Sequence, residues 1–392
     1  MYFNLVFDRF QSNRPYPNLA PWVDITQGYS KLWATEPYVI PIRLLYYVDN
    51  HDYPTRYFLS SDNFPSNSWY PIAIAFYNFG IDYFSLIPTQ VKKLLQDKKL
   101  KILFYYHEGD NPKRQLEDLD QKCRNNQLPS DCWKFVTGNS AAQQVQQFVY
   151  FPDHEMFYWK ANRQHAPLPI DNLDRPYDFT MLIRTHKWWR ATVAADLNNL
   201  GILDQSLWSY GNETTDDNFL DNPIELDSIA GLRKSLEDFM YHTPYQCDNL
   251  SSAAHNTHHI LVPEHFTQSY VHIVCETFFD VDQSDGAFLT EKVFKPIKHG
   301  QPFVCIGPSG SLQLLRNLGY KTFDNVLDNS YDSITNNTQR WHCLRTLLSN
   351  LKKQDLKKIF EKCRDDIIHN QLHFVSSKHN RLKLLQEHLN AS

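Results

Sequence analysis

The chain lacks the features that mark fibrous, disordered or membrane-spanning proteins. Its 392 residues include only 12 glycines and no low-complexity tract, which excludes a fibrous or unfolded polymer. No apolar run reaches the roughly 18 residues of a membrane span, and no basic-then-apolar leader opens the sequence. A net charge of −5 means that the chain lacks the overall positive charge with which proteins bind nucleic acid non-specifically. We therefore expect no membrane span, and nucleic acid is disfavoured as a partner.

The cysteine pattern argues against a disulfide framework. Seven cysteines are scattered along the chain, and no two have the Cys-x-x-Cys spacing of metal or redox motifs. Cys275 and Cys305 lie inside apolar runs, as buried thiols do. This usage is typical of a reducing compartment, so we expect a cytoplasmic protein.

What the chain does contain is enough apolar material for two cores. Hydrophobic residues make up 42% and aromatic residues 14%, and the length suits two domains. Strand-like and helix-like runs alternate, which predicts an α/β fold. Expected strands lie at 39–48, 100–107, 132–138, 147–151, 177–183, 270–276 and 301–306. Expected helices lie at 89–98, 114–125, 191–200, 289–300 and 311–319.

Domain boundaries follow from the proline-rich stretch 161–176, which has the composition of a linker. We predict an N-terminal α/β domain at 1–165 and a second Rossmann-like domain at 166–340. Leucines at helical spacing predict a C-terminal helical segment at 341–392 that packs across the domains.

The most informative polar cluster is Thr290-Glu291-Lys292, at the start of the helix expected at 289–300. The preceding strand, 270–276, ends at Glu276. In open α/β sheets ligands bind outside the carboxyl ends of the strands, and a helix N-terminus there favours an anion. Glu291 can accept hydrogen bonds from sugar hydroxyls, and Lys292 can face a phosphate.

A second basic cluster follows the strand at 177–183. Seven positions at the turn between this strand and the next helix contain four basic or imidazole side chains: Arg184, His186, Lys187 and Arg190. Such a cluster suits a pyrophosphate. The alternative for Arg184 and Lys187 is a solvated basic turn. Trp188 and Trp189, beside this cluster, are either core residues or flank a nucleotide.

A third feature is Glu108, which follows the strand at 100–107. A carboxylate at a strand end can take a proton from a hydroxyl group. The residues that follow, Gly109-Asp110-Asn111-Pro112, are typical of a turn, so Glu108 can also be a turn residue. Asp110 is the nearest rival for the role of a base, and Glu155 is another carboxylate that can face an acceptor.

Taken together, these motifs resemble the donor-binding signature of the α-1,3-fucosyltransferase family. The matching elements are Cys275-Glu276-Thr277, then residues 288–292 with Thr-Glu-Lys, then the Gly307-Pro308-Ser309 turn. Arg190 and Glu108 fall on a family arginine and on the family's catalytic carboxylate. The chain departs from the pattern at Thr277, where the family has asparagine, and in a longer loop after it.

The resemblance implies a fold, a reaction and a set of site residues. The fold is the GT-B arrangement, with two Rossmann-like domains facing a cleft and a helical C-terminal tail. The implied donor is a nucleotide sugar, with a GDP-sugar favoured and a UDP-sugar possible, and no metal is required. Its expected contacts are Arg184, Lys187, Arg190, Glu276, Thr290, Glu291 and Lys292. Glu108 and Arg190 are the expected catalytic residues.

The expected reaction is transfer of fucose or another hexose to a glycan or other hydroxyl acceptor, with inversion. The chain would be a cytosolic bacterial or viral relative, in the host cytoplasm if viral. One alternative is a non-catalytic nucleotide- or carbohydrate-binding protein on a transferase scaffold. Another is a viral enzyme that glycosylates modified DNA bases.

Two further clusters give weaker indications of metal. His255, His258 and His259 have spacing that can share a helix face, but no partner residue has ligand spacing. Asp280, Asp282 and Asp285 resemble the start of a calcium loop without the flanking helices. Calcium and zinc are the minority interpretations, and we assign no metal ligand. The acidic loop can instead be a donor lid or a divalent-cation site near the pyrophosphate.

Overall fold

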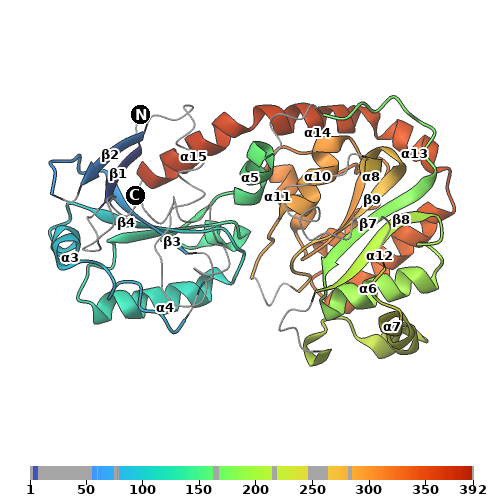
Figure 1. Cartoon of the computed structure of the whole chain (residues 1–392), viewed down its shortest axis with the longest axis horizontal. Coiled ribbons are helices and arrows are strands. Elements are labelled where there is room, and N and C mark those ends of the chain that lie inside the picture. Colours follow the sequence, from blue (N-terminus) through green and yellow to red (C-terminus); the bar gives the residue numbers. More distant parts are fainter. Residues whose placement is uncertain are drawn as a thin grey trace. The chain divides into compact units, whose positions relative to one another are not determined.

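The computed structural model describes most of the chain and divides it into two compact units. The described residues are 3–7, 55–59, 61–74, 77, 79–161, 167–213, 219–245, 264–280 and 285–390. The first unit comprises residues 1–157 and 378–392, and the second comprises 158–377 (Figure 1). The expected strand at 39–48 lies outside the described residues. The α/β prediction is confirmed, with one parallel sheet in each unit.

The first unit is built on a parallel sheet with the strand order β2-β1-β3-β4-β5-β6. Its strands are β1 (Phe3–Phe7), β2 (Thr55–Leu59), β3 (Ser68–Ile74), β4 (Lys101–Tyr106), β5 (Trp133–Thr137) and β6 (Phe148–Tyr150). Its helices are α3 (Thr89–Gln96), α4 (Pro112–Asn125) and α15 (Lys378–Asn390). Helix α5 (Asp153–Ala161) begins in this unit and ends in the second.

Helix α4 shows how sequence sets local structure in this unit. The side chain of Asn111 accepts hydrogen bonds from the backbone of Lys113 and Arg114, and Pro112 occupies the first helical position. Leu119 and Cys123, one turn apart, are buried against the sheet. The core they join is aromatic: the rings of Phe135 and Phe148 are 4.8 Å apart, and such pairs add to the stability that burial gives.

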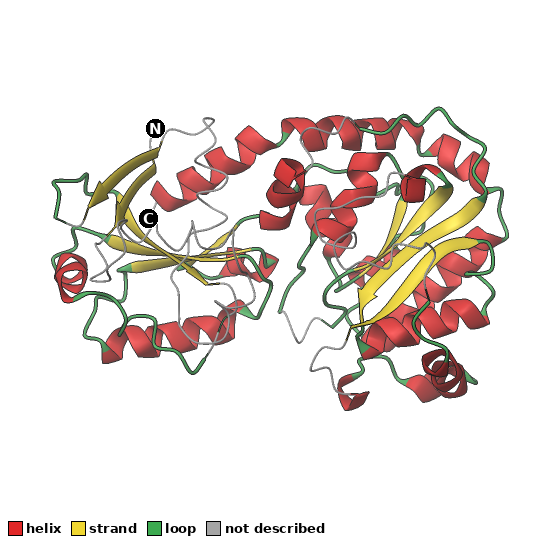
Figure 2. Ribbon diagram, viewed as in Figure 1, coloured by secondary structure: helices red, strands yellow, loops and turns green. Residues whose placement is uncertain are grey.

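The second unit has a four-stranded sheet with the order β10-β9-β7-β8, and Figure 2 shows helices on both of its faces. The strands are β7 (Tyr177–Thr185), β8 (Ser206–Glu213), β9 (Ser269–Cys275) and β10 (Phe303–Ile306). The helices are α6 (Trp188–Asn199), α7 (Leu232–Tyr241), α8 (Glu264–Thr267), α10 (Glu291–His299), α11 (Ser311–Asn317), α12 (Asn337–Lys352), α13 (Leu356–Lys362) and α14 (Arg364–Ser376).

The order of these strands reverses between β7 and β9. The chain passes from β7 through α6 to β8 on one side, and from β9 through α10 to β10 on the other. Helices α6 and α10 accordingly lie on opposite faces of the sheet (Figure 1). The carboxyl ends of β7 and β9 therefore flank a topological switch point, where ligands bind in open α/β sheets.

One helix boundary differs from that expected. Helix α6 begins at Trp188 rather than 191, because Lys187 already has the extended backbone of a residue that precedes a helix. The C-terminal helices are divided between the units: residues 341–377 belong to the second and 378–392 to the first. Among the described residues, no helix combines the length and apolar character needed to cross a bilayer.

Candidate functional site

The candidate site begins where β9 ends, at the buried side chain of Glu276. Its carboxylate accepts hydrogen bonds from the backbone N–H groups of Thr290 (3.2 Å) and Thr277 (3.3 Å). It also accepts one from the hydroxyl of Thr290 (2.5 Å). The sequence predicts that Glu276 contacts the nucleotide. In the structure these three bonds use its carboxylate to fix the start of α10.

Thr290 and Lys292 form the N-terminus of α10. Thr290 Oγ1 accepts a hydrogen bond from the backbone N of Lys292, which is a helix cap. The Lys292 ammonium lies 3.0 Å from Thr290 Oγ1, 3.3 Å from Thr277 Oγ1 and 3.4 Å from Glu291 Oε1. The side chain of Lys292 is 29% exposed and that of Glu291 only 6%. Lys292 is therefore oriented by its neighbours and still open to a ligand.

Lys295, which the sequence patterns did not single out, adds a second cation one turn further along α10. It is half-buried and makes no hydrogen bond or ion pair with any described residue. Burial lowers the pKa of its ammonium; Glu291 and Glu276 act to raise that pKa, and Lys292 and Arg184 to lower it. An anionic ligand would stabilise the charged form of Lys295. The i+3 spacing from Lys292 was the available signal.

The end of β7 brings further cations to the same edge. The β7–β8 register shifts between Ile183 and Thr185, beside Arg184. A Cβ atom on Gly211 of β8 would lie 2.1 Å from the carbonyl oxygen of Arg184, so only glycine permits this approach. Lys187 reaches across the switch point, because its ammonium donates to the carbonyl oxygen of Thr277 (2.9 Å).

Arg190 joins the same two strand ends from within α6. Its Nε and Nη2 donate to the carbonyl oxygen of Glu276 (3.2 and 2.5 Å), and its Nη1 donates to that of Thr185 (3.1 Å). The side chain is buried, and burial lowers the pKa of its guanidinium. A guanidinium has five N–H groups, so two remain for a ligand beyond these three bonds. In the structure its main contacts are with the backbone.

Cations outnumber carboxylates among the described side chains around the ends of β7 and β9 and the start of α10. The cations are Arg184, Lys187, Arg190, Lys292 and Lys295, and the carboxylates are Glu276 and Glu291, so these seven groups carry a formal charge of +3. An excess of fixed positive charge beside a helix N-terminus favours a multiply charged anion. The sequence-predicted donor residues are thus brought together in one unit.

The two tryptophans beside the basic cluster have different surroundings. Trp189 is buried and stacks on Phe279, with ring centroids 5.4 Å apart, so it belongs to the core. Trp188 is half-buried and meets His186 and Phe219 edge-on, at 4.8 Å each. His186 is itself held by Tyr210 through a 2.8 Å hydrogen bond. Only Trp188 keeps a partly open face at this edge.

The N-terminus of α11, after β10, is already occupied by a protein carboxylate. Asp332 accepts hydrogen bonds from the backbone N of Leu312 and of Gln313, both at 2.9 Å. Asp332 thus supplies the negative charge that an external anion would bring. Of the two helices that follow β9 and β10, α10 is the one whose N-terminus carries cations.

Glu108 lies in the first unit, at the carboxyl end of β4. Its side chain is 30% exposed, and its Oε1 is 3.2 Å from Nε2 of His107. Thr137 donates to the backbone carbonyl of Glu108 (2.9 Å), and Asn139 donates to that of Gly109 (2.8 Å). The turn after β4 is therefore anchored by its backbone, which leaves the carboxylate at the surface of the sheet edge.

The two other candidate carboxylates, Asp110 and Glu155, each bond to another side chain of the protein. Asp110 accepts a hydrogen bond from the hydroxyl of Tyr106. Glu155 is 1% exposed and forms a buried ion pair with Arg381, at 2.9 Å. Glu155 is a structural residue on this geometry, and the side chain of Glu108, 30% exposed, is the more accessible of these two carboxylates.

Metal-binding arrangements are absent from the part of the chain that the structure describes. No group of three or more His, Cys, Asp or Glu side chains there has the geometry of a metal site. His255, His258, His259 and Asp282 lie outside the described residues.

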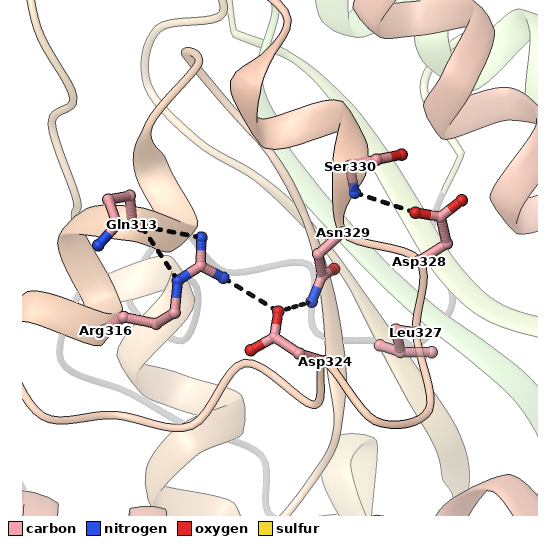
Figure 3. A pocket seen from close by; sticks show the side chains of 7 residues that line it. All are labelled: Gln313, Arg316, Asp324, Leu327, Asp328, Asn329 and Ser330. Atoms are coloured by element: carbon pink, nitrogen blue, oxygen red, sulfur yellow. Dashed lines mark hydrogen bonds and ion pairs between the residues drawn. The ribbon is translucent and has the colours of Figure 1, made fainter.

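A polar hollow of about 450 Å³ lies elsewhere in the second unit (Figure 3). It lies between α11 and the segment 324–330. Arg316 donates to Asp324 (3.0 Å) and to Gln313 (3.4 Å), so its charged group is already paired across the hollow. It shares no residue with the cation cluster, which we regard as the stronger candidate site because cations outnumber carboxylates among its described side chains.

Comparison with known proteins adds no family: no protein-family model and no curated protein sequence matches the chain.

Proposed function

We propose that the chain is a sugar-nucleotide glycosyltransferase that moves fucose or another hexose to an acceptor hydroxyl with inversion. A GDP-sugar is the favoured donor and a UDP-sugar the second. The proposal includes the GT-B arrangement of the two units, and it places the donor on the second unit and the acceptor on the first.

The observation that carries the proposal is the formal +3 cluster at the switch point between β7 and β9. A nucleoside diphosphate carries the multiple charge that such a cluster favours. Cleavage of the bond between sugar and diphosphate increases the negative charge on the leaving group. Fixed cations stabilise that charge in the transition state.

Each residue has a distinct part in this mechanism. Lys292, Lys295, Arg184 and Lys187 bind the diphosphate. Glu291 accepts hydrogen bonds from ribose hydroxyls, beside the Thr290 cap. Glu108 takes the proton from the acceptor hydroxyl as its oxygen attacks the anomeric carbon.

The role that we propose for Arg190 differs from the one expected from the sequence. Its bonds to the carbonyls of Thr185 and Glu276 hold the ends of β7 and β9 in register. Its remaining N–H groups and its positive charge then add to the electrostatic attraction for the diphosphate. We assign it first as a positioning residue and only second as a phosphate ligand.

Donor hydrolysis tests the proposal without knowledge of the acceptor. The full chain is incubated with a panel of GDP- and UDP-hexoses, and released diphosphate is measured by anion-exchange chromatography. We expect slow release from one donor, loss of that release in Lys292→Ala, and no loss in Lys358→Ala. Lys358 is a surface residue of α13 and serves as the control.

The outcomes separate the alternatives. Binding of a sugar nucleotide without release, in the presence of a broad set of hydroxyl acceptors, would support the non-catalytic binding protein. Absence of binding by every donor would refute both. Transfer only to modified DNA would support the viral base-modifying enzyme.

A further inference from the structure

Two thiols of the first unit lie in contact beneath the end of α4. Cys123 is in the last turn of α4 and Cys132 directly precedes β5. Their sulfur atoms are 3.9 Å apart, and the residues are 1% and 3% exposed. The backbone N of Leu128 donates to the carbonyl of Cys123 (3.2 Å), and that of Ile102 to the carbonyl of Cys132 (2.7 Å). Both main chains are therefore fixed while the side chains meet.

The other described cysteines have no such arrangement. Cys275, Cys305 and Cys363 are buried and Cys343 is partly exposed, and no sulfur contact joins any of them in the described part of the chain. Cys275 and Cys305 lie on the paired strands β9 and β10 and are buried to a similar degree, at 5% and 1% exposure. They serve as matched buried thiols without a sulfur partner.

The contact makes the two thiols unequal. The hydrogen bond with Cys132 lowers the pKa of Cys123, and the same bond raises the pKa of Cys132. The thiolate is the form that attacks an oxidant, and the direction of these pKa shifts favours Cys123 for that role. The Cys123 sulfur also contacts the carbonyl oxygens of Leu128 (3.6 Å) and Pro129 (3.4 Å). Cys132 is placed to react with the oxidised product.

The segment that covers the pair, residues 127–131, lies partly at the surface. Gln127 ends α4 with φ of 55°, a left-handed conformation that is unfavourable for a non-glycine residue. Gln127, Ser130 and Asp131 are exposed. Helix ends and exposed loops open at low free-energy cost, which gives a small oxidant access to the sulfurs.

We propose that Cys123 and Cys132 form a redox site that a hydroperoxide converts into an intramolecular disulfide. The Cys123 thiolate attacks the peroxide oxygen, the O–O bond breaks, and Cys123 becomes a sulfenic acid as the first water or alcohol leaves. The Cys132 sulfur then attacks the Cys123 sulfur and displaces water. Two thiols lose two electrons and two protons, and the hydroperoxide is reduced by the same two electrons.

Peptide mapping of the full chain tests this site. The native protein is treated with hydrogen peroxide, alkylated and digested with trypsin. We expect the dipeptide Cys123-Arg124 joined to the peptide 125–134, with its mass lower by two hydrogens than the sum of the two. Titratable thiols should fall from the seven of the sequence to five, and dithiothreitol should restore them. Cys275 and Cys305 should remain reduced.

Single variants distinguish the two roles. In Cys132→Ala, dimedone should trap a sulfenic acid at Cys123, because no partner thiol resolves it. In Cys123→Ala, Cys132 should remain unmodified. Failure of the joined peptide to form in the native wild-type chain, while Cys343 is oxidised, would overturn the proposal. Its formation only in urea would overturn it as well.

Discussion

The cation cluster draws its side chains from separate elements: Lys292 and Lys295 come from α10, and Arg190 comes from α6. Glu291 and Lys292 stand out in the sequence because Thr-Glu-Lys follows a strand, and the structure places them at a helix start. Lys295 lies three residues after Lys292, and this spacing on one helix face was the signal for it in the sequence. Arg190 reads as a phosphate ligand, yet most of its bonds go to backbone carbonyls that no sequence pattern specifies.

The carboxylate of Glu108 provides the first prediction at this scale. Glu108→Gln keeps the shape and removes the basicity, so transfer should fall by roughly 10²- to 10⁴-fold. Donor affinity should hardly change, because the donor residues all lie in the second unit. Transfer kinetics and calorimetry on the same preparation measure both quantities.

Two comparison variants guard against choosing the wrong carboxylate. Asp110→Asn should retain most of the activity, because Asp110 is bonded to Tyr106. Glu155→Gln should lower stability, because it leaves Arg381 buried without its charge partner. Normal transfer by Glu108→Gln together with a large loss in Asp110→Asn would transfer the role to Asp110.

At the scale of elements, we expect the start of α10 to couple helix stability to ligand binding. Thr290→Ala removes the cap and the bond to Glu276, and should cost about 1 kcal/mol of unfolding free energy. It should also weaken nucleoside-diphosphate binding by about two- to fivefold, because Lys292 loses its orienting hydroxyl. Urea denaturation and calorimetry provide the two measurements.

The matched control is another helix cap. Asp355 caps α13 by accepting from the backbone N of Lys358 (3.2 Å). Asp355→Ala should cost a similar amount of stability and leave the affinity unchanged. Equal losses of affinity in both variants would mean that stability, rather than the helix start, determines binding.

The connection between β7 and β9 gives a prediction about stability. Arg190→Ala leaves the carbonyls of Thr185 and Glu276 without their donor in a buried setting, and should cost about 2–4 kcal/mol. Arg190→Lys should recover part of this loss. The exposed pair of Arg364 with Asp171 offers a control, where Arg364→Ala should cost about 0–1 kcal/mol. Urea midpoints that are equal for Arg190→Ala and Arg364→Ala would contradict the positioning role.

At the scale of the whole molecule, the alternation of strands and helices was readable, whereas the path of the chain was not. Periodicity and turn residues place β4, β7, β9 and α10 close to their observed positions. The assignment of 378–392 to the first unit depends on contacts such as Glu155 with Arg381, which are 226 residues apart. Contacts over that separation leave no local signal in the sequence.

Acid stability is a property of the whole fold that one buried histidine allows us to predict. Burial lowers the pKa of His272 in β9 from 6.5 to about 3. As the pH falls, His272 therefore takes up its proton at a higher pH in the unfolded chain than in the folded chain. The unfolding free energy decreases accordingly between about pH 6.5 and pH 3. His272→Gln should remove up to about 1.4 kcal/mol per pH unit from the slope of unfolding free energy in that window.

Urea titrations of the wild type and of His272→Gln at several pH values measure this difference. Other groups titrate in both proteins and cancel in the comparison. Parallel curves for the two proteins between pH 6.5 and pH 4 would show that His272 is protonated in the folded state.

Calorimetric titration measures whether the cation cluster at the switch point binds a nucleoside diphosphate, as we propose. The wild type, Lys292→Ala, Lys295→Ala and the surface control Lys358→Ala are each titrated with GDP and UDP. We predict one binding site for at least one diphosphate, weakened about ten- to hundredfold by Lys292→Ala. Lys295→Ala should weaken it in the same direction, and Lys358→Ala should change it by less than about twofold. Unchanged affinity in Lys292→Ala and Lys295→Ala, or no binding of either diphosphate by the wild type, would contradict the account.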